Sequence, residues 1–143
     1  MEKWFITTIQ YEKEIGGGKS KKVKESFLVS GIDFGEAENR IIEEARSFIS
    51  NEFEVESVKR EIINEMFKNE EGGSWFKVKL NFFTTDEYGK EKKTKNIIYV
   101  QCMDIENVIE KLTEGMKGTM SDWKPNSIVE TNILDVFEFD LNK

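Results

Sequence analysis

Two lysine-rich segments are the part of this sequence best suited to binding chemistry. Each follows a glycine and holds four lysines within six residues, namely Lys19, Lys21, Lys22 and Lys24 in the first and Lys90, Lys92, Lys93 and Lys95 in the second. Residues 18–24 carry +4 and residues 89–95 carry +3, so the rest of the 143-residue chain carries −14 of a formal net charge of −7. The sequence predicts an acidic body with two basic arms. A phosphate-bearing ligand would relieve the repulsion between the lysines, and the alternative is that they protect exposed sheet edges.

Six further residues are candidate ligand contacts. Trp4 and Trp75 are at the start of predicted strands. If they face outward they can stack on a base or nucleotide ring, and the alternative is that each closes the end of a hydrophobic core. Arg60 follows Lys59 on a predicted strand and is a candidate anion anchor. Residues 115–121 contain two glycines and invite comparison with a phosphate-binding loop. The glycines of such a loop precede a helix, whereas these glycines follow the end of a predicted helix. If an anion binds there, the donors are Lys117, Thr119 and Ser121.

The composition argues against most catalytic chemistries. The chain has no His, so a Ser-His-Asp or Cys-His nucleophile and His-ligated zinc are excluded. The single cysteine, Cys102, is predicted to be a small buried hydrophobe, because it cannot form an internal disulfide or a Cys-rich metal site. The 28 Asp and Glu residues show no spacing typical of a catalytic dyad. We therefore expect no catalytic residue, no metal and no cofactor, and a catalytic function has the least support.

An internal repeat is predicted from a comparison of the chain with itself. Shifting the sequence by 71 residues aligns Trp4 with Trp75 and all four lysines of each segment, without a gap over about 65 residues, with 13 identical positions. Val58 then matches Val129, and Ile62 matches Ile133. We expect two copies, at residues 1–70 and 71–143, joined by a linker that contains Gly72 and Gly73.

Each copy shows the same order of predicted elements. Alternation of apolar residues predicts strands at 4–14 and 75–85, and a glycine-containing turn leads to a second strand in each copy. Asp33 and Asp104 are predicted helix N-caps, followed by an apolar stripe at helical spacing. A third strand is expected at residues 56–67 and 127–139. The predicted fold is α+β: a duplicated β-β-α-β unit forming antiparallel sheet with two helices around a pseudo-twofold axis.

The sequence resembles an uncharacterised family of small proteins from gut bacteria and their phages. The resemblance extends over nearly the whole length and is carried by the strings at residues 11–13, 37–44, 52–55, 59–60 and 114–120. The resemblance implies a biological setting and no mechanism. Small acidic phage proteins often act by occupying a nucleotide signal, a host protein or a nucleic-acid surface.

These observations favour a non-catalytic binding module. The leading hypothesis is a phage counter-defence protein that sequesters a nucleotide-type or other phosphate-bearing ligand at the seam between copies or between subunits of a homo-oligomer. The alternatives are a nucleic-acid-binding protein that uses both lysine-rich hairpins, and an acidic protein–protein inhibitor or scaffold with a host-protein partner. No stretch reads as a signal peptide or a membrane span, so a cytoplasmic location without membrane contact is expected.

Overall fold

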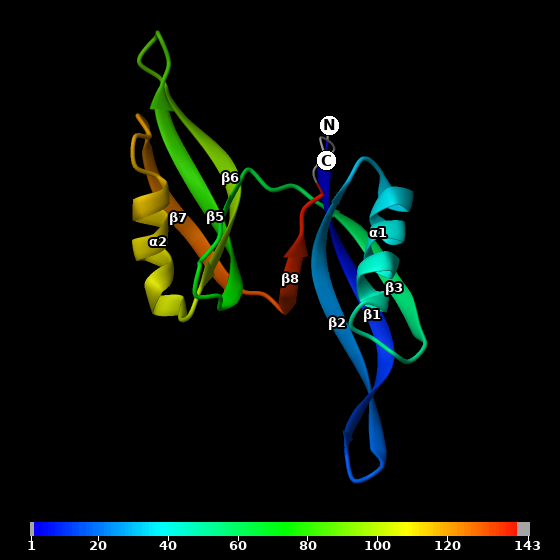
Figure 1. The fold of residues 1–143 in the computed structure, drawn as a ribbon. Coiled ribbons are helices and arrows are strands. Elements are labelled where there is room, and N and C mark those ends of the chain that lie inside the picture. The colour runs from blue at the N-terminus through cyan, green and yellow to red at the C-terminus, as the bar shows by residue number, and fades with distance from the viewer. Residues whose placement is uncertain (1, 140–143) are drawn as a thin grey trace. The chain divides into compact units, whose positions relative to one another are not determined.

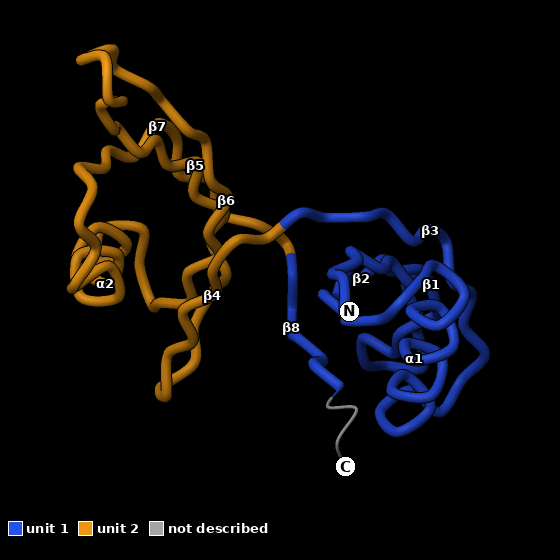
Figure 2. Tube along the Cα trace, turned by 90° about the horizontal axis from the view of Figure 1, so that it is seen from above, with its two compact units in different colours: residues 1–62, 133–143 blue, residues 63–132 orange. Residues whose placement is uncertain are grey.

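The computed structural model describes residues 2–139, so residues 140–143 of the expected second copy lie outside the described part. The chain divides into two compact units, residues 1–62 with 133–143 and residues 63–132 (Figure 2). Each unit contains one four-stranded sheet and one α-helix. The predicted α+β class is confirmed.

Unit 1 is a helix packed on a mixed sheet (Figure 1). Its elements are β1 (Lys3–Gly16), β2 (Lys19–Gly31), α1 (Phe34–Arg46), β3 (Phe53–Glu61) and β8 (Ile133–Phe137). The strand order is β3-β1-β2-β8. Strand β1 is antiparallel to both β2 and β3, whereas β8 is parallel to β2. Strands β3 and β8 are therefore the two edges of this sheet.

The sequence of unit 1 explains these elements directly. Residues 3–9 of β1 alternate in burial, so the side chains of Phe5, Thr7 and Ile9 enter the core. Positive φ angles at Gly16, Gly17 and Gly18 (104°, 61° and 75°) make the turn into β2. Asp33 caps α1 as predicted, because its carboxylate accepts a 2.8 Å hydrogen bond from the Glu36 amide. The core lies between α1 and the sheet and includes Phe5, Ile9, Phe27, Val29, Ala37, Ile41 and Ala45.

Unit 2 has the same layers built from other parts of the chain. Its elements are β4 (Glu65–Phe67), β5 (Ser74–Thr85), β6 (Glu91–Cys102), the 3₁₀ turn η1 (Ile105–Asn107), α2 (Val108–Gly115) and β7 (Asp122–Glu130). The strand order is β4-β6-β5-β7, with β4 parallel to β6 and the other pairs antiparallel. Its core includes Phe76, Val78, Leu80, Ile98, Val100, Val108 and Leu112.

The third strand expected in each half of the chain is in fact two strands. Strand β3 ends at Glu61 and β4 begins at Glu65, and likewise β7 ends at Glu130 and β8 begins at Ile133. In each case the second piece joins the sheet of the other unit, β4 in unit 2 and β8 in unit 1. The unit boundaries therefore fall after residues 62 and 132, whereas the sequence placed a boundary at residue 70.

Two smaller expectations are wrong. Asp104 makes no side-chain cap, because the chain first forms η1 and α2 begins only at Val108. The gapless 71-residue register holds in the hairpins, where Phe5 faces Val29 and Phe76 faces Val100. It changes to 70 residues in the next ladder, since Thr7 faces Val58 while Val78 faces Ile128. The pairs Val58/Val129 and Ile62/Ile133 are thus not equivalent positions.

Candidate functional site

The lysines of the first segment lie on the far end of the β1–β2 hairpin, beyond the part that α1 covers (Figure 1). All four side chains are exposed. Lys22 and Lys24 lie opposite Glu12 and Gln10 in the ladder, whereas Lys21 lies directly opposite Lys13. Because alternate residues of a strand point to opposite faces, Lys21 projects on one side of the hairpin and Lys22 and Lys24 on the other.

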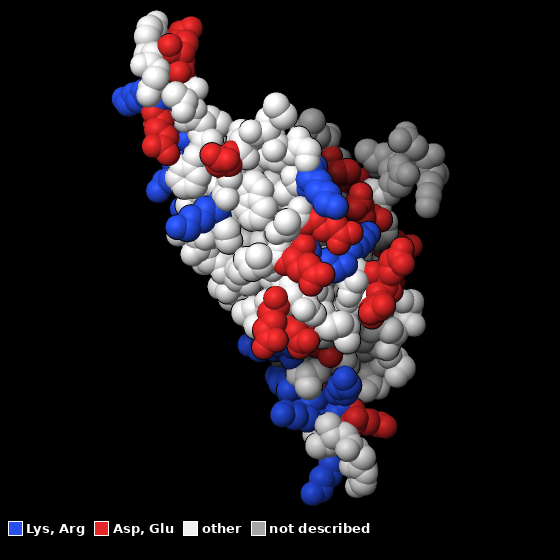
Figure 3. Space-filling view, turned by 90° about the vertical axis from the view of Figure 1, so that its left-hand side faces the viewer, with Lys and Arg blue, Asp and Glu red and all other residues white. Residues whose placement is uncertain are grey.

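The hairpin tip has an excess of positive charge that its own carboxylates do not neutralise. Residues 12–24 carry five lysines and two glutamates, a net charge of +3. Lys24 pairs with Glu56 at 3.0 Å, and Lys13 lies 3.7 Å from Glu25. Among the described residues Lys19, Lys21 and Lys22 make no ion pair. In Figure 3 the blue side chains gather accordingly over this tip, at the bottom of the view.

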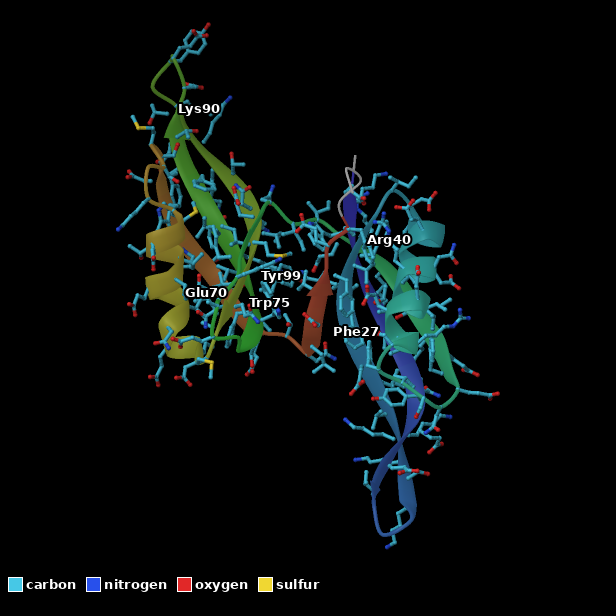
Figure 4. All side chains as sticks on the ribbon, viewed as in Figure 1. Phe27, Arg40, Glu70, Trp75, Lys90 and Tyr99 are labelled. Atoms are coloured by element: carbon cyan, nitrogen blue, oxygen red, sulfur yellow. The ribbon has the colours of Figure 1, made fainter. Side chains whose placement is uncertain are left out.

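The second lysine set is arranged differently. Lys90 lies in the turn of the β5–β6 hairpin, and Lys92, Lys93 and Lys95 lie on β6 (Figure 4 labels Lys90). Residues 83–95 carry four lysines and three acidic residues, a net charge of +1. Asp86 shapes the turn, because its carboxylate accepts hydrogen bonds from the amides of Tyr88 and Lys90, both shorter than 3.0 Å. The two lysine sets belong to different units, and the β1–β2 set is the more strongly basic.

The tryptophans do not lie beside the lysines of their own hairpins. Trp4 and Trp75 are at the start of β1 and β5, where they face Ser30 and Gln101. From Trp4 to Lys13 is about 30 Å along an extended strand at roughly 3.4 Å per residue. Trp75 and Lys90 are likewise at opposite ends of their hairpin (Figure 4). Trp4 is half-buried and Trp75 is 2% exposed, so Trp75 presents no free ring face for stacking.

The remaining candidates are scattered. Arg60 is exposed on β3, opposite Phe5 in the ladder and at the far end of the sheet from the hairpin tip. Lys117 and Thr119 are exposed in the connection after α2. Gly118 there has φ of 88°, and the Thr119 amide donates to the Met116 carbonyl at 3.1 Å, which describes a helix end with a tight turn. Arg60 lies away from the lysine set of its own unit. The connection after α2 enters β7 at Asp122, which pairs with Phe83 on β5, and Phe83 lies opposite Lys93, so this connection lies near the second lysine set.

A groove of about 800 Å³ lies in unit 1 between α1, the α1–β3 connection and the start of β3. Ile42, Ile49, Phe53 and Val55 provide its apolar wall, and Lys22 reaches it from the hairpin. Its charged lining consists of four carboxylates and two cations, from Glu12, Glu38, Glu52, Glu54, Lys22 and Arg46. The sequence analysis missed this groove, because only the fold brings residues of the helix next to β3.

Tyr11 lies in the lining of the same groove and has a perturbed hydroxyl. Its Oη donates a 2.7 Å hydrogen bond to Glu25 on β2. Burial raises the pKa of Tyr11 to about 12, and the hydrogen bond to Glu25 and the charge of Glu25 act in the same direction. The phenol is therefore a hydrogen-bond donor at physiological pH, and it fixes the side chain of Glu25.

Cys102 is a buried free thiol in unit 2, which confirms its expected burial. Burial raises the pKa of Cys102, although a backbone hydrogen bond with Asp104 opposes that shift. A protonated, buried thiol is a poor nucleophile. No group of three or more His, Cys, Asp or Glu side chains within residues 2–139 is arranged to hold a metal ion.

Comparisons with known proteins identify a family and no activity. A family model described as a domain of unknown function (DUF4494) matches residues 3–139. Neither the curated proteins nor the solved structures gave a significant match. In the described part of the chain, every helix is too short or too polar to cross a membrane.

Proposed function

We propose that this chain, which belongs to the DUF4494 family of domains of unknown function, is a non-catalytic binding protein for a phosphate-bearing ligand. Its anion site is the tip of the β1–β2 hairpin, defined by Lys19, Lys21 and Lys22. The single observation that carries the proposal is that these exposed lysines make no ion pair among the described residues on a tip with a net charge of +3.

Phosphate is the anion that fits this tip best. Ammonium groups bind phosphate as point charges and need no planar alignment, so lysines on both faces of a twisted hairpin can approach several phosphate oxygens. A ligand with more than one phosphate can reach more than one of them. Lys13 and Lys21 face each other in the ladder, and an anion between them would remove an unfavourable like-charge contact.

The more specific form of the proposal is sequestration of a nucleotide-type ligand in phage counter-defence. It depends on the biological setting implied by the resemblance of the sequence. With Trp75 buried, a nucleotide base has to find its contact elsewhere. Tyr11 lines the groove into which Lys22 reaches, and its half-buried ring is the nearest aromatic candidate.

Nucleic-acid binding is the second candidate, and its salt dependence distinguishes it. Four tip lysines that each met a backbone phosphate of duplex DNA would give a logarithmic salt slope of about −3.6. A small ligand held by one or two lysines gives a slope nearer −1. The acidic remainder of the chain opposes a long polyanion, which favours the small ligand.

We also propose that the two halves of the chain descend from one duplicated unit. The two hairpins have the same pairing register, which supports this proposal. Trp4 pairs with Ser30 in the first hairpin, and the residues 71 positions later, Trp75 and Gln101, pair in the second. A register irregularity occurs between Thr8 and Ile9 in one ladder and between Lys79 and Leu80 in the other, again 71 residues apart. Only the first half kept a strongly basic tip.

The test is to purify the full chain, denature it, and analyse the released small molecules by absorbance at 260 nm and phosphorus-sensitive mass spectrometry. The matched variant is Lys19→Gln/Lys21→Gln/Lys22→Gln, which keeps side-chain length and removes the excess charge of the tip. The proposal predicts a phosphate-bearing molecule in the wild-type fraction and its loss from the variant. Equal recovery from both proteins would place the ligand away from the β1–β2 tip.

A further inference from the structure

Within residues 2–139, no strand of unit 1 pairs with the outer edge of β3 at residues 53–55, beside the groove. Strand β3 is the outer strand of its sheet, and β1 is its sheet partner. It contains no proline, whereas the corresponding edge strand of unit 2, β7, contains Pro125. A free edge presents a row of backbone N–H and C=O groups that can pair with an added strand.

The side chains at the start of β3 alternate in character. Phe53 and Val55 face Tyr11 and Ile9 in the ladder and so lie on the side of α1. Glu54 faces Gln10 and therefore points to the opposite side of the sheet. An added strand would meet apolar side chains on one face and a carboxylate on the other.

The groove extends the apolar face outward from the edge. Residues Glu38, Ile42 and Arg46 are spaced four apart on α1, so they form one stripe along the helix, and all three line the groove together with Phe53 and Val55. Ile42 is half-buried and Ile49 is 7% exposed, so apolar surface is already present at the bottom. A groove of about 800 Å³ is large enough for several side chains of an extended peptide.

The charge of the groove favours a peptide with basic side chains. Its lining carries a net charge of −2, and within residues 2–139 Glu38, Glu52 and Glu54 make no ion pair. Unpaired carboxylates around an apolar floor complement lysine or arginine side chains.

We propose that β3 and this groove bind an extended peptide in which basic and apolar residues alternate. The peptide adds as a fifth strand at the β3 edge and gains backbone hydrogen bonds there. Its apolar side chains enter the groove between α1 and β3. Its basic side chains point to the opposite face of the sheet, where they contact Glu54 and the neighbouring Glu52, while Glu38 on α1 adds negative charge to the groove. This site is distinct from the anion site except at Lys22, which lines the groove and repels a basic side chain placed next to it.

The experiment uses the full chain and a fluorescein-labelled peptide of five Lys-Val repeats, followed by fluorescence polarisation. The variant Glu38→Gln/Glu52→Gln/Glu54→Gln weakens binding by about tenfold or more, because the negative charge that attracts the basic peptide is removed from the groove and from the start of β3. The matched control Glu106→Gln/Glu110→Gln/Glu114→Gln removes three exposed carboxylates from η1 and α2 of unit 2 and leaves the affinity within about twofold. Thermal unfolding of all three proteins establishes that each is folded. Equal weakening by both variants would overturn the proposal.

Two further measurements test strand addition and charge selection separately. Two peptides are made, one methylated at every odd backbone nitrogen and the other at every even one. Each lacks the backbone donors along one edge of the strand, so at least one of the two peptides loses binding. Unchanged binding of both methylated peptides would exclude strand addition.

The variant Glu52→Lys/Glu54→Lys is expected to prefer a Glu-Val peptide over the Lys-Val peptide. Failure of this preference to reverse would show that the groove carboxylates do not select the partner.

Discussion

Lys13 and Lys21 lie directly opposite each other in the β1–β2 ladder, so two ammonium groups face each other across the hairpin. Only Lys13 has a carboxylate nearby among the described residues, Glu25 at 3.7 Å. A like-charge pair in this position is unfavourable for folding. The proposed anion site therefore predicts that an anion bound at this tip raises the stability of unit 1.

Replacing Lys21 by Glu turns this contact into an attractive pair. The Lys21→Glu variant is expected to be more stable than wild type by about 0.2–1 kcal/mol in the absence of added anion, because the cross-strand pair changes sign. Thermal unfolding at low salt measures the difference. Added tripolyphosphate is expected to raise the melting temperature of wild type and not that of Lys21→Glu. A variant that is less stable than wild type without anion would argue that Lys21 already has a stabilising partner.

The Tyr11–Glu25 hydrogen bond gives a pH signature. The folded-state pKa of Tyr11 is about 12, above the usual value of 10.0 for a tyrosine, so its contribution to stability is full below pH 10 and is lost as the pH rises toward 12. Tyr11→Phe is expected to be less stable than wild type at pH 9, and the gap should narrow between pH 10 and 12. Denaturant unfolding at several pH values measures this gap. A constant difference over that range would contradict the assigned titration.

A close contact in unit 2 predicts the outcome of a glycine substitution. A Cβ at Gly115 would come within 2.7 Å of the Phe67 ring, so α2 and β4 pack through a glycine. Gly115→Ala is expected to destabilise the protein by about 1–3 kcal/mol, as overpacking does. Gly35→Ala is the matched control in α1, since its Cβ would meet nothing closer than 3.6 Å. Urea unfolding compares the two. Equal effects would mean that Phe67 moves aside without cost.

Unit 1 is expected to need the C-terminal strand. In the described structure the ring of Phe137 stacks on Phe27 with centroids 5.6 Å apart, and Ile133 is 5% exposed. A chain that stops after Asn132 leaves the β2 edge unpaired and part of this core uncovered. Amide hydrogen exchange in residues 26–29 is expected to accelerate strongly in the truncated chain, and a fragment of residues 1–70 should not fold for the same reason. Unchanged protection in the truncated chain would show that β8 is dispensable.

The hairpins and α1 could be predicted from sequence because their signals are local. Alternation of apolar residues, the glycine turn and the Asp33 cap each act within a few residues. The split between β3 and β4 has no such signal. Asn64 follows Ile62 and Ile63 without a glycine or proline, and the chain is redirected there by the paired hydrogen bonds of Asn64 with the backbone of Ile97. Contacts between residues far apart in the chain therefore decide where the strand ends.

The candidate site was only partly predictable. The lysines were found because their charge is concentrated in sequence. Their separation from Trp4 follows from the length of β1, and fourteen residues of strand put its two ends far apart. The groove could not be anticipated, because Glu38 and Glu54 become neighbours of one cavity only when α1 packs beside the edge of the sheet.

The measurement that tests the central claim most directly is isothermal titration calorimetry of the full chain with tripolyphosphate at low salt. We expect Lys19→Gln/Lys21→Gln/Lys22→Gln to lose affinity by about tenfold or more, since the charge-assisted contacts of the tip are removed. The matched control Lys90→Gln/Lys92→Gln/Lys93→Gln is expected to lose much less, because those lysines lie among Asp86, Glu87 and Glu91. Equal affinity of wild type and the β1–β2 variant, or a larger loss in the control, would contradict the account.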